Sequence, residues 1–254
     1  METQLRESGT PVLRGPRLPR HEAYRHIRRN VARLLSGIAA DTNPPVPACP
    51  QWRLDELLAH LVRVAATAGG HRRSSITEMF DAEHGPPDAG NGRADLLRVW
   101  ERLGADVDAM LAGRGGRTGS ILVMDAFSHE LDIRYTLDAE PTADHPAFAC
   151  AFEVAAAGFA ATVTAHQLPA LRLVATDSFG TRWTIGAGKP AATVTAGRLD
   201  LYRSLTGRRS HDQITALGWD RDSHRWLPAF TWGPFTPPPA PVEPLQTVDR
   251  LPAR

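Results

Sequence analysis

The sequence predicts a two-domain α+β protein, in which a helical bundle precedes a small mixed domain. Apolar residues recur at spacings of three and four over much of residues 20–168, and short links join these segments, which is typical of an up-and-down helical bundle. After Leu168 the apolar residues alternate with polar ones, as in strands. We therefore expect domains over 20–168 and 169–235, with loose tails over 1–19 and 236–254.

The composition is that of an ordinary globular protein and excludes several function classes. The chain has 254 residues, of which 42% are hydrophobic and 22% charged. Its net charge of +1 argues against nucleic acid or an anionic membrane as a partner. The first ten residues lack the apolar core of a signal peptide, so we expect a cytoplasmic protein.

Several motif classes are missing from the sequence. Cys49 and Cys150 are too few and too far apart to suggest a disulfide framework or a cysteine-rich metal site. The sequence has no P-loop, no G-x-G-x-x-G, no G-x-S-x-G and no Cys-His nucleophile pattern.

The first domain should contain five helices, separated by segments rich in Pro and Gly. DTNPPVPACPQW is a connection that no helix can cross, and HGPPDAGNG and GRGGRTG read as loops. The last helix is mainly alanine and is expected to be a core helix rather than a membrane span. The helices are expected over residues 21–40, 54–68, 94–111, 121–137 and 147–166.

The second domain should be a small sheet with two short helices. LRLVATD, RWTIGAG and AATVTAG alternate like strands, and DSFG between the first two is a turn. Short helices are expected over 198–205 and 211–217. From Pro228 the chain is dense in Pro and should be extended.

The helix over 121–137 carries a polar stripe that points to metal binding. Asp125 and His129 lie one turn apart, and at roughly 100° per residue Asp132 falls on the same face. Such a carboxylate and imidazole supply two of the three protein ligands of a catalytic zinc, and His60 on the 54–68 helix is the candidate third ligand. Two histidines and one carboxylate can also hold non-haem iron.

The polar stripe also has less specific interpretations. His60 can be a satisfied core histidine, and Asp125 a hydrogen-bonding residue between helices. Asp132 can be a ligand itself, or it can accept a hydrogen bond that orients a ligand imidazole.

Two arginines and the remaining histidines lie outside the stripe. Arg208 and Arg209 follow Gly207 in a loop, where one of them could grip a carboxylate with two hydrogen bonds, but spacing alone favours a solvated basic turn. The other histidines that lie in loops or near helix ends are expected at the surface: His71, His84, His145, His166 and His211.

Three segments resemble the mycothiol-dependent maleylpyruvate isomerase family, which belongs to the DinB-like superfamily. PVPACPQWRLDELLAHLV resembles the second-helix segment of that family and DAFSHELDIRYTL its fourth-helix motif. LYRSLTGRRSHDQITALGWDRD resembles the family's C-terminal domain, so the likeness extends over roughly residues 21 to 232.

This resemblance implies a site and its residues. In the family, an N-terminal four-helix bundle holds a divalent metal, usually zinc, and the matching positions here are His60, Asp125 and His129. The type enzyme has Glu where Asp125 stands, so metal distance or metal choice can differ. The family's C-terminal domain contributes a catalytic arginine, for which Arg208 and Arg209 are the candidates, and Asp132 is placed to accept a proton.

The resemblance also implies the chemistry. The thiol cofactor mycothiol binds the metal as a thiolate and attacks a small, carboxylate-bearing electrophile. Addition to a cis-alkene, rotation and elimination give an isomerase, whereas addition alone gives a thiol S-transferase. The alternative is a non-catalytic metal-binding sensor or interaction module. The sequence identifies neither the substrate nor the oligomeric state.

Overall fold

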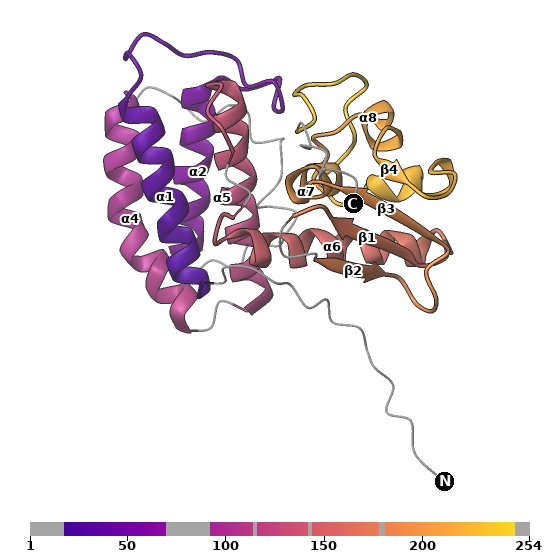
Figure 1. The fold of residues 1–254 in the computed structure, drawn as a ribbon. Helices are drawn as coiled ribbons and strands as arrows, with labels where there is room; N and C mark the ends of the chain where they lie inside the picture. The colour runs from indigo at the N-terminus through magenta and orange to yellow at the C-terminus, as the bar shows by residue number, and fades with distance from the viewer. Residues whose placement is uncertain (1–17, 70–91, 114–115, 142–143, 178–180, 247–254) are drawn as a thin grey trace.

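The chain folds into a helical bundle beside a small sheet, so the predicted two-domain α+β architecture is confirmed (Figure 1). The structure is a computed structural model that describes residues 18–69, 92–113, 116–141, 144–177 and 181–246. Four helices stand side by side in the bundle: α1 (Arg20–Ser36), α2 (Leu54–Gly69), α4 (Arg93–Gly113) and α5 (Gly116–Thr136).

The bundle forms because each helix turns an apolar stripe towards its neighbours. Ile27 and Val31 of α1 and Trp100 and Val107 of α4 are buried in the same hydrophobic core, and the two helices are in contact. The indole Nε1–H of Trp100 donates to the hydroxyl of Tyr24 at 3.0 Å, so this polar atom is satisfied inside the core.

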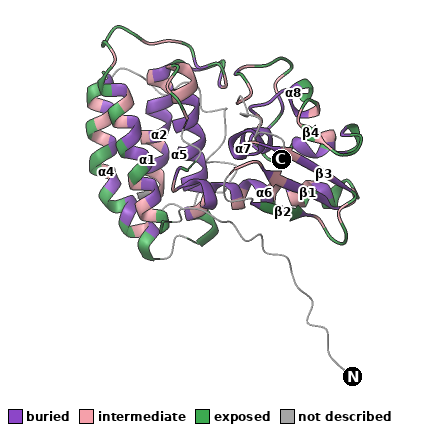
Figure 2. Cartoon of the chain, in the orientation of Figure 1, coloured by how far each residue is buried: buried purple, intermediate pink, exposed green. Residues whose placement is uncertain are grey.

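The helix α5 has a long buried central part. Every residue from Ile121 to Ile133 is buried, because α5 lies between the bundle and the second domain (Figure 2). It begins at Gly116 rather than at the predicted residue 121. Gly119, which the sequence placed in a loop, is helical and lies so close to α4 that a Cβ would come within 2.8 Å of Leu111 Cδ2.

A fifth helix, α6 (Phe148–Ala165), runs beneath the sheet (Figure 1). Phe152 stacks on Trp183 with 4.0 Å between ring centroids, and Phe159 packs on Phe230. By length and composition α6 could cross a membrane, but its aromatic residues are buried inside the protein, as expected of a core helix. The helix α6 contacts both α5 and the sheet. The domain boundary near residue 168 therefore stays a prediction.

The sheet has four strands in the order β2-β1-β3-β4. Strand β2 pairs antiparallel to β1, and β3 pairs parallel to β1. Strand β4 pairs antiparallel to β3 at the other edge of the sheet. Three strands match the prediction with shorter bounds, and the two-residue β4 was not predicted. The strands are β1 (Leu171–Ala175), β2 (Arg182–Ile185), β3 (Ala192–Ala196) and β4 (Gly218–Trp219).

The helices α7 (Arg198–Leu205) and α8 (His211–Thr215) confirm the two predicted short helices. Ser210 and Gln213 form a capping box that starts α8. A 3₁₀ helix, η1 (His224–Phe230), contains Pro228, so the prediction of extended chain from this residue is wrong for the end of η1.

The segment over residues 236–246 is not the loose tail that the sequence predicted. Glu243 is buried, its carboxylate receives two hydrogen bonds of 2.6 Å from Arg203, and it also pairs with Arg209. The Gln213 amide donates to the Glu243 carbonyl at 2.8 Å. Long-range ion pairs of this kind have no local sequence pattern, which explains why the prediction missed them.

Candidate metal centre

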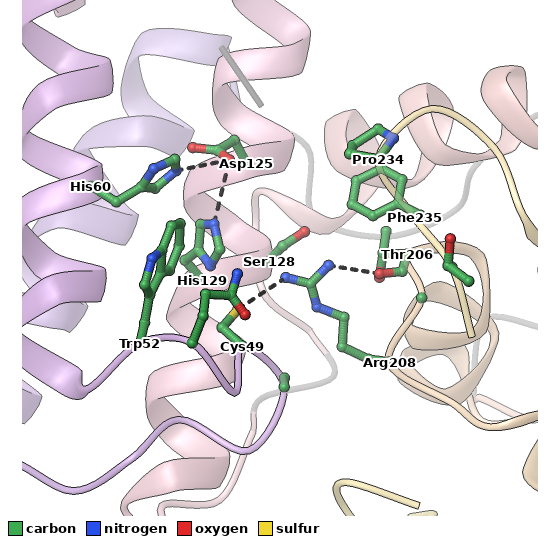
Figure 3. Close-up of a pocket in the computed structure, with 14 residues that line it drawn as sticks. Cys49, Trp52, His60, Asp125, Ser128, His129, Thr206, Arg208, Pro234 and Phe235 are labelled. Atoms are coloured by element: carbon green, nitrogen blue, oxygen red, sulfur yellow. Dashed lines mark hydrogen bonds and ion pairs between the residues drawn. The ribbon is translucent and has the colours of Figure 1, made fainter. Parts of the chain in front are cut away.

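A pocket of about 200 Å³ lies between the bundle and the second domain (Figure 3). Five parts of the chain form its wall: the loop before α2, α2, α5, the turn after α7, and the segment after η1. The lining residues are Ala48, Cys49, Gln51, Trp52, His60, Asp125, Ser128, His129, Thr206, Gly207, Arg208, Pro234, Phe235 and Thr236.

Three of the residues that the sequence singled out meet in this pocket. His60 Nε2 and His129 Nε2 each lie 3.5 Å from Asp125 Oδ1, and one ligand atom from each residue lies within 4.8 Å of the other two. All three side chains are buried. The α2 residue therefore converges with the two α5 residues, at a separation that one small cation can bridge.

The hydrogen bonding of this group is incomplete. Within the described residues, His60 Nε2 and Asp125 Oδ2 are buried and have no hydrogen-bond partner. Buried polar atoms are nearly always hydrogen-bonded, so two unsatisfied atoms at one point indicate that a ligand or ion binds there. Two imidazoles and a carboxylate are a donor set that suits zinc or a similar divalent metal, and the residues present fit such an ion.

Burial and neighbouring charges shift the pKa values of the group. Burial opposes ionisation of Asp125, but the two imidazoles outweigh it and hold the pKa of this carboxyl below its usual range. Burial lowers the pKa of His60, which favours the neutral imidazole that binds metals. Burial would also lower the pKa of His129, but hydrogen bonds to Asp125 and Asp132 raise it well above the usual value.

Asp132 lies behind His129 and orients it. Its carboxylate accepts a hydrogen bond from His129 Nδ1 at 2.9 Å, which turns Nε2 of the same ring towards Asp125. Arg203 and Arg208 also donate to it, at 2.6 and 2.9 Å. Burial raises the pKa of Asp132, but the two guanidinium groups outweigh it, and its pKa lies well below the usual value.

The two neighbouring arginines have different surroundings. Arg208 lines the pocket, and its guanidinium also donates to the Thr206 carbonyl at 2.7 Å. Arg209 binds Asp200 at 2.8 Å and pairs with Glu243. Both are buried, so the interpretation of a solvated basic turn is wrong.

The turn that carries these arginines requires glycine. Gly207 has φ of 68°, and a Cβ there would lie 2.9 Å from the Thr236 backbone nitrogen. This close approach brings residues 206–208 against the segment after η1, and it positions Arg208 at the pocket wall.

Sequence reasoning missed two residues of the α1–α2 loop. The Trp52 ring lies 4.8 Å from that of His60 and 5.9 Å from that of His129, between centroids, and so restricts both imidazoles. Cys49 Sγ lies 3.7 Å from Asp132 Oδ2, so a cysteine stands beside the His129–Asp132 pair although the sequence shows no Cys-His pattern. Their position in the family-like segment CPQW was the available signal.

Cys49, His129 and Asp132 form a second group with spacing suited to a metal. Asp132 is already engaged by two guanidinium groups, so its charge is neutralised and its oxygens are occupied. The group around Asp125 has the unpaired atoms and is the better candidate.

One of the histidines expected at the surface is buried instead. His145 Nε2 lies 3.0 Å from Glu130 Oε2, and the ring packs on Phe127, because the connection before α6 folds back over α5. His166 and His211 are exposed as expected, and His71 and His84 lie outside the described residues.

Comparisons with known proteins agree with this architecture. The family model described as the mycothiol maleylpyruvate isomerase N-terminal domain matches residues 24–134. A crystal structure of the mycothiol-dependent maleylpyruvate isomerase is similar with a TM-score of 0.52 and 16% identity, over 80% of this chain and 92% of that chain. A crystal structure of a mutant of that isomerase gives the same values. At this identity the likeness shows the fold. No curated protein matches the sequence significantly.

Proposed function

We propose that this chain is a cytoplasmic mycothiol-dependent isomerase or thiol S-transferase. The match of residues 24–134 to the model of the mycothiol maleylpyruvate isomerase N-terminal domain supports this proposal. The observation that carries the proposal is the pair of unpartnered buried atoms, His60 Nε2 and Asp125 Oδ2, at the wall of a pocket between two domains. Most buried polar atoms are hydrogen-bonded, and these two belong to residues that line a cavity.

In this proposal, His60, Asp125 and His129 hold a divalent metal, for which zinc is the first choice. When bound, the metal supplies a Lewis acid that favours the thiolate form of the mycothiol sulfur. Ionised Asp125 compensates the charge of the ion, and Trp52 and Asp132 fix the two imidazoles, so that little reorganisation is needed on binding.

The opposite wall of the pocket supplies positive charge. Arg208 lines it, and Phe235 packs under its guanidinium, with 5.7 Å between Cζ and the ring centroid. A carboxylate on the electrophile would be attracted to this charge, which would hold the reacting carbon near the thiol. We therefore propose a small carboxylate-bearing electrophile as substrate and assign its orientation to Arg208. Arg208 is ion-paired with Asp132 and Arg209 with Asp200 and Glu243, but Arg209 is not among the residues that line the pocket, so we assign it to support of the turn.

The test is turnover by the zinc-loaded protein with mycothiol and a panel of electrophiles. Isomerisation of a cis-alkene diacid without net loss of mycothiol identifies an isomerase, whereas stoichiometric thiol loss with an alkylating electrophile identifies an S-transferase. Arg208→Met should raise KM at least tenfold for carboxylate substrates, with a much smaller change for an uncharged electrophile. His211→Ala, at an exposed position, is the control. Bound metal without turnover of any substrate would favour the non-catalytic sensor.

A further inference from the structure

Cys49 is a free thiol in the wall of the same pocket. The loop before α2 holds it, since the Cys49 N–H donates to the Val46 carbonyl at 3.0 Å and the Cys49 carbonyl accepts from the Trp52 N–H at 2.8 Å. Its sulfur lies 3.9 Å from Arg208 Nη2, and Figure 3 shows the two side chains directed towards each other. The same sulfur lies 3.7 Å from Asp132 Oδ2, so polar contacts hold the thiol at the pocket wall.

A second observation points to a ligand in this pocket. His60 lines the same cavity, is buried, and has no hydrogen-bond partner at Nε2 within the described residues. A small thiol that enters towards His60 must therefore pass through a cavity of about 200 Å³ that Cys49 also lines.

The other cysteine provides a contrast within the same chain. Cys150 lies on α6, is more exposed than Cys49, and burial raises the pKa of its thiol. If exposure alone decided reactivity towards a disulfide, Cys150 would react first. A faster reaction at Cys49 than at Cys150 would therefore show that the position of Cys49 in the pocket, rather than exposure, controls the reaction.

We propose that Cys49 is a thiolation site, at which the disulfide of a low-molecular-weight thiol exchanges to leave that thiol covalently attached inside the pocket. This proposal rests on the proposed function, because it assumes that the pocket accepts such a thiol. The attached group would lie beside Arg208 and His129, where it would block access to the metal centre until an excess of reduced thiol removes it.

The reaction needs no oxidant besides the disulfide. The Cys49 sulfur attacks one sulfur of the disulfide, and the new S–S bond forms as the old one breaks. The leaving thiolate takes up the proton that Cys49 lost. Cys49 is oxidised to the mixed disulfide, and half of the small disulfide is reduced to thiol.

The experiment treats the reduced full-length protein with mycothiol disulfide and, separately, with glutathione disulfide, and locates the adduct by intact mass and peptide mapping. We expect one adduct, on Cys49, formed at least tenfold faster than any on Cys150 and faster with mycothiol disulfide. Cys150→Ser should keep the adduct and Cys49→Ser should lose it. Should Cys49→Ser fail to fold, the peptide map of the unaltered protein decides.

The outcomes separate this inference from the proposed function. An adduct on Cys150 at an equal or higher rate, or none on Cys49, overturns the thiolation site even if the reduced enzyme turns over with mycothiol. An adduct on Cys49 that abolishes turnover, with recovery after reduction, supports it. Modification of Cys49 in a protein that has no mycothiol-dependent activity supports the thiolation site and counts against the proposed function.

Discussion

The helix α5 carries two buried clusters of histidine and carboxylate that differ in how well their atoms are paired. In the first cluster, Asp125 and His129 face His60, and polar atoms are left over. In the second, Glu130 Oε1 accepts from Asn30 and Arg134 at 3.0 and 2.8 Å. Its Oε2 has no hydrogen-bond partner within the described residues, but it lies 3.0 Å from His145 Nε2, closer than the 3.5 Å contacts of Asp125.

Both ring nitrogens of His145 have close polar neighbours in the second cluster. The Ala147 N–H donates to His145 Nδ1 at 3.1 Å, and Nε2 lies 3.1 Å from Asn30 Nδ2 and 3.0 Å from Glu130 Oε2. The residue types of the two clusters are nearly the same. Longer contacts and a position in the wall of a pocket, rather than the presence of buried histidine and carboxylate, therefore distinguish the candidate site.

The largest expected effect is on metal binding. Asp125→Ala should abolish zinc binding, because it removes a charged ligand, and Asp125→Glu should restore part of the affinity. Glu130→Gln should bind zinc like the unaltered protein. Competition with a chelating dye measures all three. Equal losses in Asp125→Ala and Glu130→Gln would show that the two clusters do not differ as proposed.

The stability of the metal-free protein should show the reverse order. Glu130→Ala should lower the free energy of unfolding by about 3–5 kcal/mol, because it strips a buried ion-paired network of its carboxylate. Asp125→Ala should cost less, about 1–3 kcal/mol, since the partners of Asp125 lie at 3.5 Å, whereas those of Glu130 lie at 2.8 and 3.0 Å. Urea unfolding with a chelator present measures both values, and a larger loss for Asp125→Ala would contradict the assignment.

A smaller effect is expected behind the metal site. Asp132→Asn should weaken zinc affinity about 10–100-fold, the usual range for a residue that orients a ligand, while metal still binds at saturation. The same dye competition tests it. If Asp132→Asn lost the metal completely while Asp125→Ala kept it, the roles of the two aspartates would be reversed.

The smallest effects belong to histidines outside both clusters. His166→Ala and His211→Ala alter exposed side chains, so each should change the free energy of unfolding by less than about 0.5 kcal/mol and leave zinc affinity unchanged. A zinc loss in either variant would mean that metal binds outside the proposed centre.

Sequence reasoning reached the fold class and the pairing of Asp125 with His129, because both follow from local periodicity. The convergence of His60 on them required the additional inference that its helix packs beside α5. His145 and the two arginines were misjudged, since their burial depends on partners such as Glu130, Asp132 and Glu243, which lie far away in the sequence. No pattern within a short window distinguishes a buried ion pair from a solvated turn.

Glu243 also implies an order of assembly. Arg203 joins its carboxylate to Asp132, so the support of His129 runs through a residue made long after the candidate ligands. During synthesis His60, Asp125 and His129 leave the ribosome first, while the buried guanidinium groups of Arg203 and Arg209 still lack one of their counter-charges. The electrostatic setting of the metal centre is therefore complete only once residue 243 has been added to the chain.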